Sequence, residues 1–196
     1  NVDDIDIATT LTPEEIIAKF SNSDFEIKKT GIEHGTLTLV INKKAFEITT
    51  LREDVSTDGR HAKISFTEDW KKDSERRDFT INAIYLDRKG RLFDPQSGIN
   101  DLKNRKIKFI GEPSKRIEED YLRIIRFIRF SLHYNDLSLE ESTLKAIKLN
   151  LNGIKNLSKE RILNELLKII KLNNFEEILL NDTFINIFSL IFPEFK

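Results

Sequence analysis

Two aspartates near the start of the chain, Asp4 and Asp6, are separated by a single isoleucine. In a β-strand, alternate residues share a face, so both carboxylates would point to one side of the strand. Two carboxylates at this spacing can share one or two hard divalent cations, which prefer oxygen ligands. The same spacing also occurs on solvated surfaces, so the pair predicts a metal site only if a further ligand lies close by.

A third carboxylate, Glu47, lies in residues 45–50, a stretch with the alternation of a strand, and it is flanked by apolar residues. Alternation places its side chain on the face opposite those neighbours. If this strand lies beside the first one, Asp4, Asp6 and Glu47 converge on one site. If it does not, Glu47 is an ordinary exposed strand residue, which its spacing alone favours.

Residues 76–83, RRDFTINA, form a second polar cluster. The guanidinium groups of Arg76 and Arg77 can bind anions, while Asp78 and Asn82 supply directed acceptors. The alternative is a solvated helix end at which Asp78 caps the next segment. Composition alone does not separate these two interpretations.

A third cluster lies in residues 114–134, which the apolar periodicity predicts to be one long amphipathic helix capped by Ser114. At 100° per residue, one polar face of this helix collects Arg116, Glu119, Asp120, Arg123 and Arg126. Asp120 and Arg123 are spaced for an ordinary ion pair within the helix. Side by side, the same acceptor and donor could instead read the edge of cytosine or adenine, whereas guanine and uracil present other patterns.

Composition limits the classes of function. The chain has 196 residues, 39% of them hydrophobic, and a formal net charge of −1, so a nucleic-acid partner would require a local basic surface. Without cysteine there are no disulfides and no thiolate metal sites, which is typical of a cytoplasmic protein. No signal peptide or membrane-spanning apolar run is visible. No Gly-rich phosphate loop or nucleophile elbow is present either, which leaves metal-assisted phosphoryl chemistry as the main enzymatic option.

The pattern of elements changes near residue 112, from mixed α/β to helical. A helix over residues 13–20 is predicted to begin at Thr12, with Glu15 closing a capping box. Residues 51–65 are polar and predict a mobile loop. The other expected elements are strands at 25–29, 35–41 and 45–50 with a tight connection at 42–44, a hairpin over 81–94, helices at 141–150, 158–170 and 174–180, and an apolar segment at 183–195 that packs or forms an interface.

Taken in order, six segments resemble the class II tRNA nucleotidyltransferase family, which comprises the CCA-adding enzymes and the related bacterial poly(A) polymerases. They are DIDIAT (4–9), TGIEHGTLTLVI with FEITTLRED (30–54), RRDFTINA (76–83), FDPQSGINDL (93–102), EEDYLRIIRFIRF (118–130) and LSKERILNELLKII (157–170). The resemblance runs from Asp4 to about Ile170 and implies an α+β fold. Residues 1–111 would be a polymerase-β-like nucleotidyltransferase head with a mixed sheet and helices, and residues 112–196 an all-α neck and the start of the body.

The resemblance also implies roles for the clusters. The reaction would be transfer of CMP and AMP from CTP and ATP to the tRNA 3′ end, with two Mg²⁺ ions held by Asp4 and Asp6. Glu47 would complete the cage or act as base. The other implied roles are ribose selection by Asp78 with an arginine from Arg76 and Arg77, a nucleotide contact by Asn82, base selection by Asp120 and Arg123, a phosphate contact by Arg126, a hinge at Asp94, Gly98 and Asp101, a buttressing helix at 157–166 and a C-to-A switch in the loop at 51–65.

Two alternatives stay open beside a CCA-adding enzyme: a bacterial poly(A) polymerase, and a non-catalytic or split RNA-binding subunit of such an enzyme. The family's Gly-Gly-x-x-Arg-Asp segment, which binds the triphosphate, is not found among these residues, and neither are its far C-terminal helices. Because the chain also has no methionine, we expect it to be a processed or partial chain that is incomplete for activity. Expected partners are tRNA, CTP and ATP, with a complementary chain or a homodimer left open and no membrane.

Overall fold

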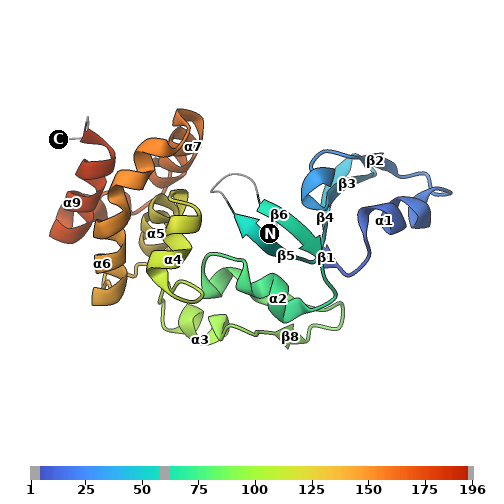
Figure 1. The fold of residues 1–196 in the computed structure, drawn as a ribbon, viewed down its shortest axis with the longest axis horizontal. Coiled ribbons are helices and arrows are strands. Elements are labelled where there is room, and N and C mark those ends of the chain that lie inside the picture. Colours follow the sequence, from blue (N-terminus) through green and yellow to red (C-terminus); the bar gives the residue numbers. More distant parts are fainter. Residues whose placement is uncertain (1–4, 58–61, 194–196) are drawn as a thin grey trace. The chain divides into compact units, whose positions relative to one another are not determined.

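The computed structural model describes residues 5–57 and 62–193, so Asp4 and His61 lie outside the described residues. The described residues divide into two units. The N-terminal unit comprises residues 5–57 and 62–76, and the C-terminal unit comprises residues 77–193. Figure 1 shows both and labels most of their helices and strands. A mixed sheet with helices, followed by further helices, confirms the predicted α+β class.

A four-stranded sheet forms the centre of the N-terminal unit, in the order β1-β4-β3-β2. Its strands are β1 (Asp6–Thr9), β2 (Glu26–Lys28), β3 (Thr36–Ile41) and β4 (Lys44–Thr50). β1 pairs parallel with β4, whereas the other neighbours are antiparallel. A short 3₁₀ turn, η1 (Ile32–His34), precedes β3. The three strands predicted at 25–29, 35–41 and 45–50 are therefore confirmed.

Helix α1 (Pro13–Phe20) starts as the sequence predicts. The Thr12 hydroxyl accepts the Glu15 N–H at 3.3 Å, and the Glu15 carboxylate accepts the Thr12 N–H at 2.8 Å. This capping box satisfies two helix-end donors. The helix covers one face of the sheet through a small core of Ile16, Leu37, Leu39 and Ile48.

The connection between β3 and β4 is a two-residue turn. Asn42 and Lys43 both have positive φ angles, of 50° and 67°, and Ile41 pairs with Lys44. Positive φ at both turn residues matches the twist of the flanking strands, and asparagine tolerates it better than most residues. The predicted tight connection is confirmed, and it fixes the register of β4, which carries Glu47.

The prediction of a mobile loop over residues 51–65 is wrong for the described part of that segment. β5 (Arg52–Thr57) and β6 (Ala62–Phe66) pair antiparallel, with a register shift between Asp54 and Ser56. Two strands satisfy each other's backbone hydrogen bonds whatever their side chains, so a polar composition does not prevent the ladder. Helix α2 (Trp70–Glu75) follows, capped by Asp69.

The C-terminal unit begins with short elements: η2 (Thr80–Asn82), β7 (Tyr85–Leu86), β8 (Leu92–Phe93) and α3 (Gly98–Lys103). β7 and β8 form the predicted hairpin, with Gly90 at φ 79° in its turn. A Cβ atom at Gly98 would lie 2.1 Å from the Thr80 carbonyl oxygen. Glycine at position 98 therefore lets α3 approach the polar segment around η2.

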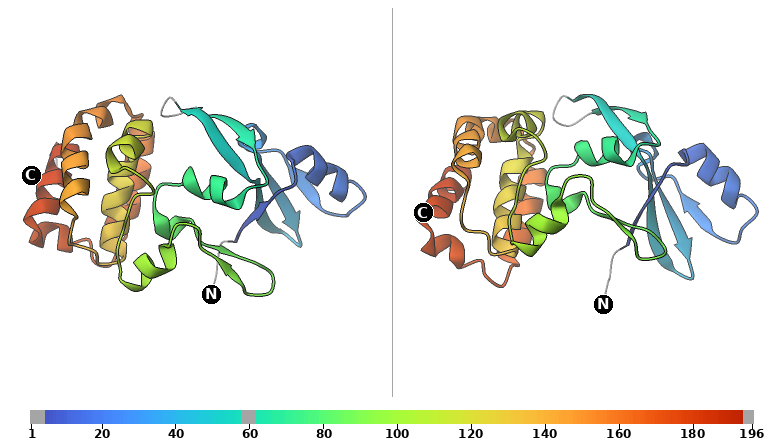
Figure 2. Two further views of the ribbon diagram at one scale, coloured as in Figure 1. Left: turned by 60° about the horizontal axis from the view of Figure 1, so that its bottom comes forward. Right: turned by 90° about the horizontal axis from the view of Figure 1, so that it is seen from below.

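Helices make up the rest of this unit, and Figure 2 shows them gathered into one bundle. They are α4 (Pro113–Glu119), α5 (Leu122–His133), α6 (Glu141–Asn150), η3 (Leu151–Asn156), α7 (Lys159–Ile170), α8 (Glu177–Leu180) and α9 (Asp182–Ile191). α5 supplies much of the buried core, including Ile124, Ile125 and Phe127. The apolar C-terminal segment packs onto it through Phe184 and Phe188. Within the described residues, no helix is both long and apolar enough to cross a membrane.

The single long helix predicted over 114–134 is wrong, because the chain breaks at Asp120 into α4 and α5. Asp120 is extended, with φ −157° and ψ 104°, and its carboxylate accepts the Leu122 N–H at 3.1 Å. A short acidic side chain that bonds the backbone locally competes with helical hydrogen bonds. Ser114 is not the cap either, since Glu112 holds that position and Pro113 opens the helix.

Candidate functional site

Asp6 and Glu47 lie side by side on the sheet. They are directly paired in the parallel ladder of β1 and β4, so their side chains share a face. Both residues are exposed, and their face is opposite the one that α1 covers. The condition set by the sequence, that the two strands be neighbours, is therefore met.

Two carboxylates on one open strand face suit a hard divalent cation such as Mg²⁺. Within residues 5–57 and 62–193, no group of three histidine or acidic residues gathers closely enough to hold a metal ion by itself. The remaining predicted ligand, Asp4, is not among these residues. Asp6 and Glu47 thus fit as two members of a cation site.

Arg76, the first residue of the RRDFTINA segment, belongs to the N-terminal unit. Its Nη2 lies 2.9 Å from the carboxylate of Asp73, a residue that is almost fully buried. The same Asp73 oxygen accepts the Arg52 N–H at 3.1 Å. In this structure Arg76 helps to fix α2 against β5, and its predicted nucleotide contact stays a prediction.

Asp78 is the most heavily bonded carboxylate of the segment and is buried (8% exposed). Its Oδ1 accepts the Phe79 N–H and the Asn82 amide, both at 2.9 Å, and its Oδ2 accepts Arg126 Nε at 2.7 Å. Burial raises the pKa of this carboxyl. The charge of Arg126 and the hydrogen bonds lower the pKa more, so it lies below its ordinary value of 3.8 and Asp78 is an anion at neutral pH.

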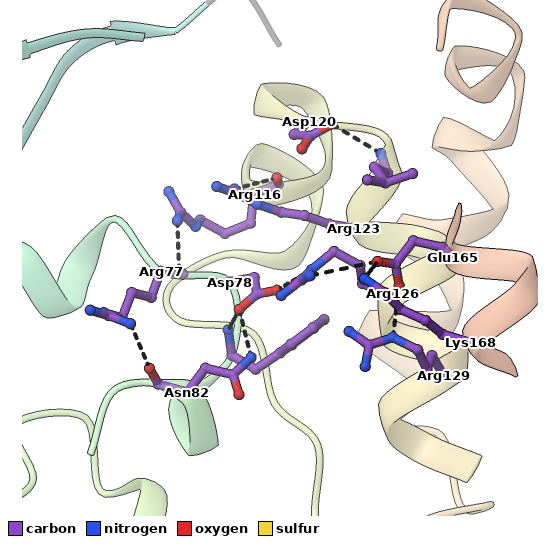
Figure 3. Close-up of polar contacts among 12 residues, drawn as sticks. Arg77, Asp78, Asn82, Arg116, Asp120, Arg123, Arg126, Arg129, Glu165 and Lys168 are labelled. Carbon is purple, nitrogen blue, oxygen red and sulfur yellow. Dashed lines mark hydrogen bonds and ion pairs between the residues drawn. The ribbon is translucent and has the colours of Figure 1, made fainter. Parts of the chain in front are cut away.

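Further bonds hold the backbone around Asp78. Arg77 donates through Nη1 to the Asn82 carbonyl at 3.3 Å, and its guanidinium lies 5.4 Å from the centre of the Tyr85 ring. From α4, Arg116 donates to the Arg77 carbonyl at 2.7 Å. Figure 3 shows how these contacts bring the 77–82 segment against α4 and α5.

A second buried carboxylate, Glu165 of α7, faces the same region and was not singled out from the sequence. It accepts Arg129 Nε at 2.7 Å and Lys168 Nζ at 2.9 Å, and it lies 3.9 Å from Arg126 Nη1. Burial raises the pKa of Glu165. The Lys168 hydrogen bond and the nearby positive charges together lower this pKa by more than burial raises it, so it lies below the ordinary value of 4.5. Glu165 therefore also carries its charge inside the fold.

The predicted base-reading pair, Asp120 and Arg123, lies at the break between α4 and α5. Asp120 Oδ2 accepts Arg161 Nη2 of α7 at 2.8 Å. Arg123 Nη1 lies 2.6 Å from Glu119 and 2.7 Å from the Arg116 carbonyl oxygen. Both groups are thus held in place, each by a partner that keeps its charge compensated.

The C-terminal unit brings together Arg77, Asp78, Asn82, Asp120, Arg123 and Arg126, all predicted from the sequence (Figure 3). The residues that the sequence analysis missed, Arg129, Arg161 and Glu165, are charged positions on amphipathic helices. A contact between positions dozens of residues apart leaves no local spacing signal. The available hint was the resemblance of residues 157–166 to a buttressing helix, which pointed to α7 without naming these side chains.

Comparison with known families gives two matches. Residues 1–108 match the family described as the poly(A) polymerase head domain. Residues 136–196 match the family described as the probable RNA and SrmB-binding site of polymerase A. Together these cover most of the chain, and the head-domain match alone covers more than half of it.

Similar curated proteins carry one activity in their names. The chain is 48% identical over 174 residues to CCA tRNA nucleotidyltransferase 1, mitochondrial, of Danio rerio, covering 86% of this chain and 40% of that protein. It is 46% identical over 179 residues to the Homo sapiens protein of the same name, covering 90% and 41%. A CCA-adding enzyme of Staphylococcus epidermidis is 40% identical over 178 residues, covering 90% and 43%.

Solved structures similar to this chain come from the same family of enzymes. A Bacillus stearothermophilus CCA-adding enzyme in complex with CTP superimposes with a TM-score of 0.74 at 35% identity, over 86% of this chain and 40% of that chain. A tRNA nucleotidyltransferase complexed with a primer tRNA and an incoming ATP analogue gives 0.76 at 28% identity, over 98% and 54%. The chain spans less than half the length of the curated relatives it matches.

Proposed function

This chain belongs to the class II tRNA nucleotidyltransferase and poly(A) polymerase family, and we propose that it carries the nucleotidyl-transfer part of a CCA-adding enzyme. The reaction would be transfer of CMP and AMP from CTP and ATP to the 3′ end of tRNA. The observation that carries the proposal is the pairing of Asp6 with Glu47 on an open sheet face. The names of the similar proteins favour CCA addition over poly(A) synthesis.

Asp4 and Asp6 are proposed as the ligands of two Mg²⁺ ions, with Glu47 as the third carboxylate of the site or as a base. When bound, Mg²⁺ supplies Lewis-acid stabilisation of the triphosphate and of the attacking 3′-hydroxyl. Asp6 and Glu47 would contribute oxygen atoms from two adjacent strands. The hydrogen bonds between β1 and β4 fix the distance between these two residues.

In the C-terminal unit, Asp78 is proposed to accept a hydrogen bond from the ribose, with Arg77 and Asn82 completing the nucleotide contacts. Arg76, the last residue of the N-terminal unit, is proposed as a further nucleotide contact. Asp120 and Arg123 are proposed to read the base. The support for this assignment is that both side chains are already oriented, Asp120 by Arg161 and Arg123 by Glu119. Pre-oriented hydrogen-bonding groups lose less entropy on binding.

We also propose the division into a head (1–111) and a helical neck and body (112–196), with tRNA, CTP and ATP as partners. A cytoplasmic site of action belongs to the same proposal, as does a complementary chain or a second copy. Sizing of the full-length protein with and without tRNA tests that last point, because a strictly monomeric, fully active protein would contradict it.

The decisive test incubates the full-length protein with tRNA lacking CCA, both nucleotides and Mg²⁺. Addition of C, C and A supports the proposal, a long A tail would reassign the protein as a poly(A) polymerase, and no addition would indicate a non-catalytic subunit. Asp6→Asn and Glu47→Gln should each reduce transfer by about a hundredfold or more, the scale of losing an electrostatic catalytic group. Glu26→Gln, an exposed carboxylate on β2, is the matched control.

A further inference from the structure

Asp78 has one hydrogen-bonding position left. A carboxylate offers about four acceptor positions, two on each oxygen. Oδ1 already accepts the Phe79 N–H and the Asn82 amide, and Oδ2 accepts Arg126 Nε. Among its contacts within the described residues, a single position on Oδ2 therefore remains for an outside donor such as a hydroxyl group.

Arg126 sets the orientation of Oδ2 of Asp78, because it bonds that oxygen. Its Nε bonds Asp78 at 2.7 Å, while its Nη1 lies 3.9 Å from Glu165 on α7. A guanidinium is planar and its donors form a rigid fork, so the direction of Nη1 sets the direction of Nε. The centre of the Phe130 ring lies 5.5 Å from the guanidinium carbon of Arg126, so the ring packs beside this group. In Figure 3 Arg126 reaches from α5 between the two carboxylates.

Glu165 is a fixed anchor for this arrangement. Only 3% of the residue is exposed, and a buried carboxylate persists as an anion only when it is well paired. Its Oε2 is held by Arg129, whereas its Oε1 is bonded by Lys168 and is the oxygen nearest Arg126. The position of Arg126 is thus tied to helix α7 as well as to its own helix.

We propose that Arg126 and Glu165 are positioning residues for ribose recognition: Glu165 orients Arg126, and Arg126 holds Asp78 with one Oδ2 position directed to a ribose 2′-hydroxyl. This inference rests on the proposed function, in which Asp78 selects ribonucleotides. It assigns Arg126 a role different from a phosphate contact, because its Nε and Nη1 both point to carboxylates.

The test compares CTP with dCTP in the full-length protein, by equilibrium binding without tRNA and by kcat/KM on tRNA lacking CCA. Glu165→Gln and Arg126→Lys should each lower the preference for CTP about tenfold, the effect of misaligning the charge-assisted hydrogen bond between Asp78 and the ribose 2′-hydroxyl. Arg126→Lys keeps the charge of the cluster but removes the Nε donor, so it serves if Glu165→Gln fails to fold. Thermal unfolding checks both variants.

Glu160→Gln is the matched control. Glu160 is an exposed carboxylate on the same helix, α7, so its loss should leave the CTP preference within about twofold of wild type. In the double variant R126K/E165Q the preference should equal that of R126K alone, because Glu165 acts through Arg126. Additive losses would overturn the proposed order of action.

The outcomes separate the inference from the function on which it rests. A wild-type protein that transfers nucleotides and prefers CTP, with variants that keep this preference, overturns the inference alone. Equal weakening of CTP and dCTP in Arg126→Lys overturns it in favour of a phosphate contact. A wild-type protein that neither binds nor transfers CTP overturns the proposed function and the inference together.

Discussion

At the scale of single residues, the C-terminal unit depends on carboxylates that stay ionised while buried. Asp78 and Glu165 both have pKa values lowered by the arginines and lysine around them. A lowered folded-state pKa stabilises the fold above the unfolded-state pKa, and that stabilisation is lost as the pH falls through the folded-state value. The stabilisation that these ion pairs give the fold should therefore be lost in acid.

We predict that Asp78→Asn lowers the free energy of unfolding by about 3 kcal/mol at pH 7, as expected when one partner of a buried ion pair is removed. Because Asp78 protonates in acid, the difference from wild type should shrink below pH 3.8. Urea unfolding followed by circular dichroism reports the helices of the C-terminal unit. Asp24→Asn, at an exposed position, is the control, and a pH-independent difference for Asp78→Asn would contradict the prediction.

The second prediction concerns Asp120. Asp120→Ala should abolish the choice between C and A, because the acceptor proposed to read the amino group of the base is removed. The Mg²⁺ dependence of the remaining incorporation should be unchanged, since Asp120 is not among the proposed metal ligands. Single-nucleotide incorporation at varied Mg²⁺ measures both. Full base selectivity in this variant would show that Asp120 does not read the base.

At the scale of elements, local signals predicted much of the fold. The capping box of Thr12 and Glu15 marked the start of α1, and the Asn42-Lys43 turn marked the β3–β4 hairpin. Each signal lies within a few residues of what it determines. For the same reason, the pairing of Asp6 with Glu47 could be anticipated only as a condition, since it depends on which strands become neighbours.

The break at Asp120 shows why the rest was not predictable. Periodicity continues through residues 114–134, so the pattern reads as one helix. The local bond from the Leu122 N–H to Asp120 competes with the helix, and two distant contacts adjoin the break: Arg161 of α7 bonds Asp120, and Gly153 of η3 lies against Tyr121. Arg161 and Gly153 both come from later helices, and sequence spacing carries no information about these two contacts.

Gly153 provides the third prediction. A Cβ atom at this position would lie 2.1 Å from two carbons of the Tyr121 ring, so Gly153→Ala must displace the ring. We expect a loss of about 1–3 kcal/mol in unfolding free energy, the usual result of overpacking. We also expect weaker discrimination between C and A, because Tyr121 adjoins Asp120. Urea unfolding and single-nucleotide incorporation measure the two effects.

The matched control is the double variant G153A/Y121L, in which a smaller, flexible side chain makes room for the new methyl group. It should recover part of the lost stability, since contacting residues are energetically coupled. If Gly153→Ala unfolds as easily as predicted but keeps full base selection, then the Tyr121–Gly153 contact supports the fold without setting the position of Asp120.

At the scale of the whole molecule, the proposed chemistry is divided between the two units. Asp6 and Glu47 lie in the N-terminal unit, whereas Asp78, Asp120 and Arg123 lie in the C-terminal unit. Metal binding and base selection should therefore be separable by mutation. The resemblance ascribes the change from C to A addition to residues 51–65, which include the hairpin of β5 and β6. This hairpin would therefore link nucleotide transfer to base selection.

The last prediction tests that hairpin. Glu53 and Ser65 are paired across β5 and β6, so replacing residues 54–64 with Asn-Gly joins them by a favoured two-residue turn. The variant keeps Arg52, whose N–H bonds Asp73, and Glu53, which lies 2.9 Å from Lys72. If the hairpin acts in the change to A, addition of C and C should continue while addition of A falls about tenfold or more.

Assays with tRNA ending in CC and with tRNA lacking CCA separate these steps, and C addition is the internal control for folding. A second variant replaces only residues 58–61 with Asn-Gly between the paired residues Thr57 and Ala62, which leaves both strands in place. This variant should still complete CCA, because the paired strands carry the proposed action. Loss of C addition in the first variant would show that the hairpin is needed for folding. Normal A addition in that variant would show that the hairpin has no role in the change from C to A.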